Sequence, residues 1–441
     1  MNDNLIRDLG NGLIIRYATK ADADALSHFN REVHAEDEWD GKGLEDWTLD
    51  LVSGESPTVK AKDITIVEDS QTGEIVSSCC LISQTWSYEG IPFKVGRPEL
   101  VGTKKEYRQR GLVRHQFEIL HDWSAERGEL VQAITGIPYY YRLFGYEMTL
   151  NLGGSRGGYK SHIPTLKEDE QEPYAFRLAG EGDVPFLMDV YEHGCRRNMI
   201  CAIWDEALWQ YELTGKRKYN INRREIYIIE DASGDRAGFI GIPPLIWGPR
   251  SVLTVYELAA GYAWPDVTPS VIRFLWQKGE ELSKEQGTTL EMVGLGLGET
   301  HPAYDVIESR LPNVQKPYAF YIRLTDLPAF LSAITPVLKD RLSKSAFAYY
   351  SGEIKLNFYK NGLSLVFKNG RMEDVKSLEF GELEPADASF PHLTFLHLLF
   401  GYRSMEELDQ MHADCFPKNG ESKNLLNVLF PKKPSNVWEI S

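Results

Sequence analysis

Residues 99–120 restrict the fold of this chain more than any other stretch, because a strand pattern, a glycine turn and a helix pattern follow one another there. The run ELVGT, which ends at Thr103, is typical of a β-strand, and the apolar i, i+4, i+7 repeat from Val113 predicts an amphipathic helix. A strand that turns directly into a helix is the repeating unit of α/β folds, in which helices cover a sheet. We therefore expect an α/β protein.

The turn between this strand and this helix is basic. Arg108 and Arg110 precede Gly111, and Arg114 follows in the first turn of the expected helix. The first N–H groups of a helix have no partner inside the helix, and the helix dipole favours negative charge there. Gly111 also lets a ligand approach the backbone closely. The stretch thus predicts an anion site, and because neither GxxxxGK[ST] nor GxGxxG occurs in it, neither a nucleoside triphosphate nor a dinucleotide is favoured.

The chain contains an internal echo. Arg16 and Asp22 have the same spacing as Arg177 and Asp183, and in both cases the aspartate stands where a helix N-cap is expected after a strand. Strand and helix patterns then follow in similar order, which indicates a duplicated α/β domain. The polar, Gly- and Pro-containing stretch 155–175 between the copies predicts a linker.

A third part follows the second copy. The chain has 441 residues, more than the roughly 250–300 over which one hydrophobic core grows, so several domains are expected. The segment EIKLNFYKNGLSLVFKNGRM alternates apolar and polar residues, and its two Asn-Gly pairs predict hairpins. We predict domains at residues 1–154, 174–325 and 326–441, the last one a small α+β domain.

Three motifs carry a family resemblance. RQRGLV at 108–113 resembles motif A of the GNAT acetyltransferases, [Q/R]-x-x-G-x-[G/A], whose turn binds the pyrophosphate of coenzyme A; Val113 stands where the family has a small residue. LVQAIT resembles the family's next strand, and YRLFGY at 141–146 resembles its closing Y-x-x-F-G-Y. With FYIRLTD at 320–326, the whole chain resembles the enhanced-intracellular-survival acetyltransferases. That resemblance implies two tandem GNAT folds and a sterol-carrier-like α+β domain.

The resemblance also implies a site. Tyr141 would be the general acid and the C-terminal carboxylate of Ser441 the base, whereas Glu99, which shares strand parity with Val101, is the rival base. The family's Ser/Thr–Glu element before the tyrosine is replaced by residues 136–138, GIP. The residues expected to bind acetyl-CoA are Val101, Gly102, Thr103, Arg108, Gln109, Arg110, Gly111, Leu112 and Val113.

The charge of the chain bears on its partners. A net charge of −16 argues against nucleic acid or an anionic membrane and suits a cationic acceptor, and His34–Asp40 is an acidic stretch where GNAT enzymes line the acceptor side. Five cysteines without zinc-type spacing, no basic and apolar leader, and no membrane-length apolar run indicate a cytoplasmic protein without metal. We expect an amine of a small molecule or lysine as acceptor, and a homo-oligomer.

Two alternatives from other classes stay open. The chain could be a non-catalytic acyl-CoA-binding protein that kept the turn and lost the chemistry, or a carrier of apolar ligands through its third domain. His301 and Asp305 fit the H-x-x-x-D pattern of another acyltransferase class, but the glycine that follows in that class is missing. We interpret this pair as structural.

Overall fold

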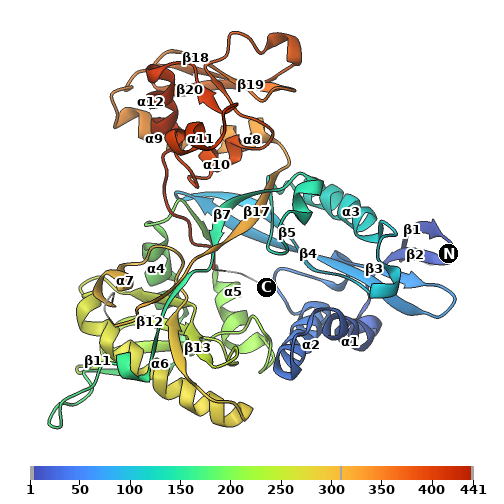
Figure 1. The fold of residues 1–441 in the computed structure, drawn as a ribbon. Coiled ribbons are helices and arrows are strands. Elements are labelled where there is room, and N and C mark those ends of the chain that lie inside the picture. Colours follow the sequence, from blue (N-terminus) through green and yellow to red (C-terminus); the bar gives the residue numbers. More distant parts are fainter. Residues whose placement is uncertain (1–3, 308–309, 439–441) are drawn as a thin grey trace.

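The structure is a computed structural model that describes residues 4–307 and 310–438. Its N-terminal sheet has the strand order β1-β2-β3-β4-β5-β6-β17-β7, and β10 pairs with β4 off this path (Figure 1). The bounds are β1 Leu5–Gly10, β2 Leu13–Tyr17, β3 Ile64–Asp69, β4 Glu74–Tyr88, β5 Ile91–Thr103, β6 Val131–Ile134, β7 Glu147–Leu152, β10 Ile200–Ala202 and β17 Tyr318–Leu324.

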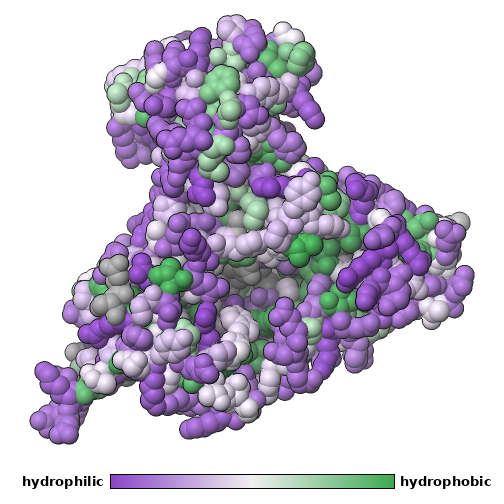
Figure 2. All heavy atoms as spheres, in the orientation of Figure 1, coloured by the Kyte–Doolittle hydropathy of each residue, from purple (hydrophilic) through white to green (hydrophobic). Residues whose placement is uncertain are grey.

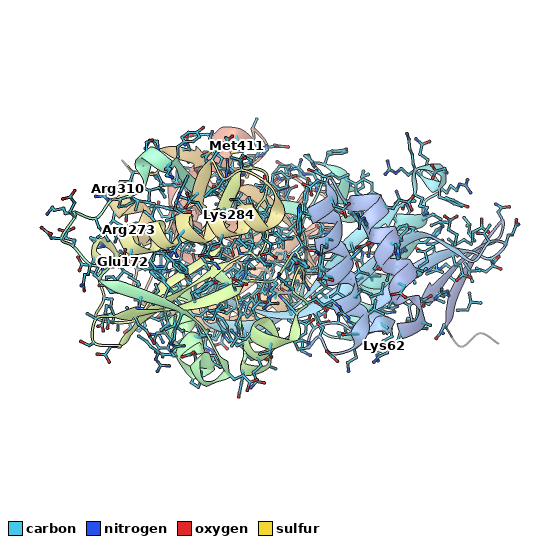
Figure 3. The ribbon with its side chains drawn as sticks, turned by 90° about the horizontal axis from the view of Figure 1, so that it is seen from below. Lys62, Glu172, Arg273, Lys284, Arg310 and Met411 are labelled. Carbon is cyan, nitrogen blue, oxygen red and sulfur yellow. The ribbon has the colours of Figure 1, made fainter. Side chains whose placement is uncertain are left out.

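Helices cover both faces of this sheet, as the near-continuous apolar character of β4 requires. On one face, α1 (Ala23–His34) and α2 (Glu38–Ser53) pack against Cys80 and Ile82, and they lie side by side in Figure 3. On the other face, α3 (Leu112–Glu126) packs against Cys79 and Leu81. The alternation along β4 follows from the two-residue period of a strand. The predicted α/β class is confirmed.

The two α/β units exchange a strand. β8 (Ser155–Tyr159), which directly follows β7, lies between β15 (Met292–Leu295) and β16 (Asn313–Gln315) of the middle unit. In return β17, which directly follows β16, lies between β6 and β7. The stretch predicted as a linker thus begins with a strand, and the sheets interlock across the predicted boundaries at residues 154 and 325.

We call residues 4–154 the N-terminal unit, residues 155–317 the middle unit and residues 325–438 the C-terminal unit. The strands of the middle unit repeat the order of the N-terminal sheet. One sheet of this unit has the order β9-β11-β12-β14, and another has the order β13-β15-β8-β16. Only one residue separates β13 from β14 in the chain, so the two sheets together correspond to the N-terminal sheet from β2 to β7. The remaining bounds are β9 Tyr174–Leu178, β11 Glu225–Asp231, β12 Arg236–Ile242, β13 Arg250–Leu253, β14 Val255–Leu258, α4 Val184–Cys195, α5 Glu206–Gln210, α6 Trp264–Gln286 and α7 Pro302–Ile307.

The echo seen in the sequence corresponds to the same ion pair in both units. Arg16 contacts Asp22, and Arg177 contacts Asp183, each at 2.7 Å. Asp22 stands at the N-cap position, as predicted, but its side chain does not cap the helix; it accepts hydrogen bonds from Arg16 and from Thr19 instead. The predicted N-cap position is therefore confirmed in both units, while the carboxylate bonds the guanidinium, which is a strong partner for it.

The C-terminal unit has the sheet β20-β19-β18-β21-β22 and helices on one side of it. Asn369 and Gly370, with φ of 50° and 75°, form the predicted two-residue hairpin between β19 and β20. At the other Asn-Gly pair the turn lies at 358–361, and Gly362 already belongs to β19. The bounds are β18 Gly352–Asn357, β19 Gly362–Lys368, β20 Arg371–Leu378, β21 Ala388–Ser389, β22 Phe416–Pro417, α8 Leu327–Ala333, α9 Thr335–Ser343, α10 Phe395–Leu399, α11 Met405–Met411 and α12 Gly420–Leu429.

Candidate active site

A cavity of about 880 Å³ opens where β5 and β6 part. The two strands pair in parallel only at Val95 with Val131 and at Gly96 with Gln132. Beyond this point β5 continues along β4 alone, with a bulge at Leu100, whose φ is 50°. The backbone groups on the free edge of β5 therefore face the cavity instead of a neighbouring strand. The volume lies within the range typical of small-molecule sites.

The turn before α3 supplies unpaired donors to this cavity. Gln109 and Gly111 both have positive φ, 64° and 75°, and Gly111 is the N-cap of α3 without a side-chain cap. In the part of the chain that the structure describes, no protein acceptor is found for the N–H groups of Gln109 and of residues 111–114. Alternating backbone conformations of this kind make anion-binding concavities, and the N-terminus of a 15-residue helix adds its dipole.

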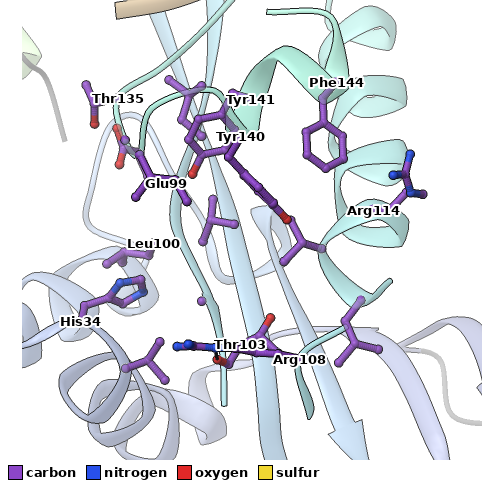
Figure 4. Close-up of a pocket in the computed structure, with 18 of the residues that line it drawn as sticks. His34, Glu99, Leu100, Thr103, Arg108, Arg114, Thr135, Tyr140, Tyr141 and Phe144 are labelled. Atoms are coloured by element: carbon purple, nitrogen blue, oxygen red, sulfur yellow. Dashed lines mark hydrogen bonds between the residues drawn. The ribbon is translucent and has the colours of Figure 1, made fainter. Parts of the chain in front are cut away.

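The structure brings the predicted cofactor residues together, with one exception. The cavity is lined by Val101, Gly102, Thr103, Arg108, Gln109, Gly111, Leu112 and Val113. Arg110 is the exception: its guanidinium lies 4.7 Å from the centre of the Tyr107 ring and donates to the Glu106 carbonyl. Arg114, which was not among the predicted residues, does line the cavity, and it lies over Phe144 (Figure 4). Apolar side chains gather beside α3 in Figure 2.

Tyr141 lies at the deep end of the same cavity. Its side chain is 7% exposed and stacks on Phe117, with 5.8 Å between ring centroids. Burial is the main reason why the pKa of Tyr141 lies well above its ordinary value of 10, and the charge of Glu99 raises it further. Figure 4 shows Tyr141 and Glu99 at the same end of the cavity. The hydroxyl is thus protonated at neutral pH and able to donate.

Two features of the tertiary structure position this tyrosine. A Cβ on Gly136 would lie 2.5 Å from the Tyr141 ring, so the glycine that replaces the family's Ser/Thr–Glu element makes room for the ring. The exchanged strand β17 supplies Tyr321, whose ring packs edge-on against Tyr141 and whose hydroxyl accepts a 2.6 Å hydrogen bond from the backbone of Tyr139. The sequence contains no local signal for the role of Tyr321, because it lies 180 residues downstream in the chain.

Glu99 stands between the main cavity and a second one of about 270 Å³. Its carboxylate forms an ion pair with Arg97, which is 2% exposed. Trp47 of α2 lines both cavities, and residues of the middle unit, among them Asn222 and Trp247, close the smaller one. Glu99 therefore lines the cavity, as predicted, but the predicted reason is wrong: the bulge at Leu100 breaks the strand parity, so Glu99 is opposite Cys80 on one face while Val101 packs on the other. The other predicted base, Ser441, lies outside the described residues.

His34 lines the candidate cavity, and the acidic residues after it make local contacts. His34 lines the cavity next to Gly102, and burial lowers the pKa of its imidazole. Asp37 caps α2, and Glu38 pairs with Arg31 at 2.5 Å. Lys42 already lies over the ring of Trp39, 4.9 Å from its centre. The face of the Trp39 ring is thus occupied by the protein's own lysine, and Asp37 and Glu38 are engaged in a helix cap and an ion pair.

The middle unit has no comparable turn at the corresponding helix. α6 begins at Trp264 with Ala263 as N-cap, Pro265 in its first turn and Pro269 inside it. Proline has no N–H to donate. His301 is buried, and its two ring nitrogens bond the Tyr256 carbonyl and the Ala303 N–H. This agrees with the structural interpretation of that histidine.

Within the described ranges, no three or more His, Cys, Asp or Glu side chains are grouped as metal ligands would be. In the same ranges, no helix has the length and apolarity needed to cross a membrane.

Comparisons with known proteins agree with this geometry. Residues 14–149 match the family profile of the acetyltransferase (GNAT) domain. A sequence comparison with curated proteins gives no match. Among solved structures, a GCN5-related N-acetyltransferase from Kribbella flavida shares 15% identity over 97% of this chain and 98% of its own, with a TM-score of 0.62.

Two further solved structures cover 97% of this chain and their whole length. They are a GCN5-related N-acetyltransferase from Anabaena variabilis, with 12% identity and a TM-score of 0.63, and Eis1 from Mycobacterium abscessus, with 10% identity and a TM-score of 0.60. The chain therefore shares its fold with these proteins over 97% of its length, and its N-terminal segment is similar to GNAT acetyltransferase domains in sequence.

Proposed function

We propose that this protein is an acetyl-CoA-dependent N-acetyltransferase that acts on a primary amine of a cationic acceptor. The observation that carries the proposal is the turn at residues 108–113, with the unpaired N–H groups of Gln109, Gly111, Leu112 and Val113, beside a cavity between parting strands. A pyrophosphate fits such a turn, because several N–H donors and a helix dipole meet a doubly charged group there. The match of residues 14–149 to the GNAT domain supports the same cofactor.

In the proposed reaction the amine nitrogen attacks the carbonyl carbon of the acetyl thioester, and the C–S bond breaks after a tetrahedral intermediate. Free N–H groups on the β6-facing edge of β5 stabilise the developing oxyanion. Tyr141 gives its proton to the departing thiolate, and a carboxylate takes the proton that the amine loses. The protonated state and the position of the Tyr141 hydroxyl support its role as the acid.

For the base we propose the C-terminal carboxylate of Ser441, with Glu99 as the rival. Glu99 is engaged with Arg97, and an ion pair lowers the basicity of a carboxylate. Trp438, three residues before the chain end, is buried, which supports an inserted rather than a frayed terminus.

We further propose the predicted tandem arrangement: a GNAT domain in the N-terminal unit, a second one without coenzyme A in the middle unit, and a sterol-carrier-like C-terminal unit. The repeated strand order and the prolines at α6 support the first two points.

The net charge of −16 supports a cationic acceptor such as an aminoglycoside, a polyamine or a lysine side chain. The five unpaired thiols support a reducing compartment such as the cytoplasm, and we keep the homo-oligomer as a proposal.

An amine-library screen with mass-spectrometric detection of acetylated products tests the proposal. We expect transfer from acetyl-CoA to a cationic primary amine, with release of one CoA thiol per product. Binding of acetyl-CoA without turnover on any amine would support a non-catalytic acyl-CoA-binding protein. Binding of apolar ligands without acetyl-CoA binding would support a carrier and contradict the proposal.

A further inference from the structure

We propose that Arg114 recognises the 3′-phosphate of coenzyme A, and that it thereby restricts the acetyl donor to free coenzyme A thioesters. This inference rests on the proposed function, because it concerns the donor of the proposed acetyl transfer. It assigns a task to a charged side chain that lies beyond the turn at residues 108–113. A 4′-phosphopantetheine thioester on a carrier protein has no 3′-phosphate and would be a poor donor.

The side chain of Arg114 borders the candidate cavity next to Phe144. Arg114 is the third residue of α3, it is exposed, and it lines the cavity. Its guanidinium lies 5.6 Å from the centre of the Phe144 ring, at the end of the short helical turn Tyr140–Phe144. In Figure 4, Arg108 lies beside Thr103 of β5, whereas Arg114 lies beside Phe144. The two arginines thus line different parts of the same cavity.

The charge of Arg114 is not neutralised by the parts of the chain that the structure describes. Across residues 4–307 and 310–438, no carboxylate pairs with its guanidinium and no oxygen accepts a hydrogen bond from it. Arg108, in contrast, donates to the Thr103 carbonyl, and Arg110 donates to the Glu106 carbonyl. A guanidinium that lies over an aromatic ring still presents its planar set of N–H donors at the edge, which suits a phosphate.

Exposed apolar side chains precede Phe144 in the chain and border the same cavity. Ile137 and Leu143 line the cavity and are 61% and 53% exposed, and Tyr139 between them is 65% exposed. Apolar side chains that gather at the surface in this way mark binding sites. A flat base can cover them while its phosphate reaches the guanidinium. An apolar surface beside an unpaired cation therefore matches adenosine 3′-phosphate, which joins a base to a phosphate.

The two anionic groups of the donor find different partners at the cavity. The pyrophosphate suits the turn, because the N–H groups of Gln109, Gly111, Leu112 and Val113 are unpaired there. The 3′-phosphate adds about 1.5 to 2 negative charges, and backbone N–H groups already used by the pyrophosphate do not neutralise them. Arg114, which follows Val113 and stands beside the apolar surface, supplies the opposite charge.

A cycle of two proteins and two ligands tests this. Acetyl-CoA and acetyl-dephospho-CoA, which lacks only the 3′-phosphate, are titrated by calorimetry into the wild-type chain and into Arg114→Gln. Arg114→Gln should weaken acetyl-CoA binding about 10-fold, as the loss of one charge-assisted hydrogen bond does, and should change acetyl-dephospho-CoA affinity less than about twofold. An equal loss for both ligands would mean that Arg114 acts on the pyrophosphate or on the fold. Either that result or unchanged affinities would overturn the inference.

Two further variants separate a contact from a general effect of charge. Arg110→Gln is the matched control, because it removes the same charge from a guanidinium that lies over Tyr107 instead of lining the cavity. It should leave the ratio of the two affinities at the wild-type value, whatever its effect on both. Arg114→Lys keeps the charge without the planar donors and should recover part of that ratio. A ratio lowered as much by Arg110→Gln as by Arg114→Gln would contradict a contact at Arg114.

Turnover measures the restriction on the donor. With an amine found in the screen, wild-type kcat/KM should be about 10-fold lower for acetyl-dephospho-CoA than for acetyl-CoA, and the two values should be nearly equal in Arg114→Gln. Binding that depends on the 3′-phosphate, without acetyl transfer to any amine, would keep the role of Arg114 and contradict the proposed function. Acetyl transfer with equal kcat/KM for both donors in the wild-type chain would keep the proposed function and exclude the role of Arg114.

Discussion

Tyr141 shows how burial prepares a residue for acid catalysis. Its hydroxyl has a pKa above 10, so the proton stays on the oxygen throughout the usual assay range. We predict that Tyr141→Phe lowers kcat about 10²–10⁴-fold while acetyl-CoA affinity, measured by calorimetry, is kept. Tyr146→Phe is the matched control, because Tyr146 lies in the same aromatic cluster and bonds His121 outside the cavity lining. A similar kcat for both variants would exclude Tyr141 as the acid.

The same raised pKa has a consequence for the pH profile. A raised pKa of an acid means that the neutral form persists to higher pH, so Tyr141 should produce no falling limb below about pH 10. The acceptor amine, with an ordinary pKa near 10.4, gains its lone pair as pH rises. We predict that kcat/KM increases steadily from about pH 6 to pH 9.5. A bell-shaped profile with a falling limb near pH 8 would contradict this assignment.

The general base can be assigned by removing the Ser441 carboxylate and the Glu99 carboxylate one at a time. Deletion of residues 439–441 should lower kcat by about 10²-fold or more if the Ser441 carboxylate is the base, whereas Glu99→Gln should then act mainly through the loss of its ion pair with Arg97. Rescue of the truncated enzyme by added formate would support a missing carboxylate. Full activity of the truncated enzyme together with an inactive Glu99→Gln would assign the base to β5.

At the scale of elements, the turn between β5 and α3 carries cofactor binding. Gly111 has φ of 75°, and a Cβ there would meet no atom within 4 Å, so the space in front of it is open for a ligand. We predict that Gly111→Trp abolishes measurable acetyl-CoA binding in calorimetry, because the indole fills that space. Gly111→Ala is the control for strain: it costs about 1 kcal/mol of stability and leaves affinity within a few-fold. Equal acetyl-CoA affinities for Gly111→Trp and the wild-type protein would mean that the pyrophosphate binds elsewhere.

At the scale of the whole molecule, one carboxylate joins two units. Glu147 of β7 accepts hydrogen bonds from Arg142 and lies 3.5 Å from His397 of the C-terminal unit. Burial alone would raise its pKa, but the hydrogen bonds from His397 and Arg142 outweigh burial and lower it from 4.5 to about 2. A lowered pKa means stability that is present above pH 4.5 and lost as pH falls toward 2.

We therefore predict that Glu147→Gln lowers the free energy of unfolding by about 2 kcal/mol at pH 7, as measured in urea. The difference from wild type should shrink as pH falls below about 4.5. Glu170→Gln is the control, since its ion pair with Lys167 is exposed and worth little. A difference that does not change with pH would mean that the charge of Glu147 is not what matters.

Long-range charge is a property of the whole chain as well. With Asp37 and Glu38 engaged locally, attraction of a cationic acceptor depends on the net charge of −16. We predict that kcat/KM for a polyamine falls as salt rises toward about 0.5 M, where screening acts within a few Å, while a neutral amine is unaffected. Equal salt dependence for both acceptors would remove the charge argument for the substrate class.

The local elements of this protein are encoded in short windows of its sequence. The order of strands and helices, the hairpin at Asn369 and Gly370, and the basic turn around Gly111 follow from periodicity, backbone preference and the unpaired N–H groups of a helix. These are short-range causes, so a window of a few residues contains them. The α/β class and the GNAT-like turn can therefore be predicted from the amino-acid sequence alone.

Contacts between distant residues depend instead on the tertiary structure. The exchange of β8 and β17 places Tyr321 against Tyr141, and the tail places Trp438 on Trp204. No local pattern encodes these contacts, because they depend on how sheets close and on which buried surfaces remain to be covered. For the same reason the sequence alone does not show that Asp37 caps α2 or that Glu38 pairs with Arg31.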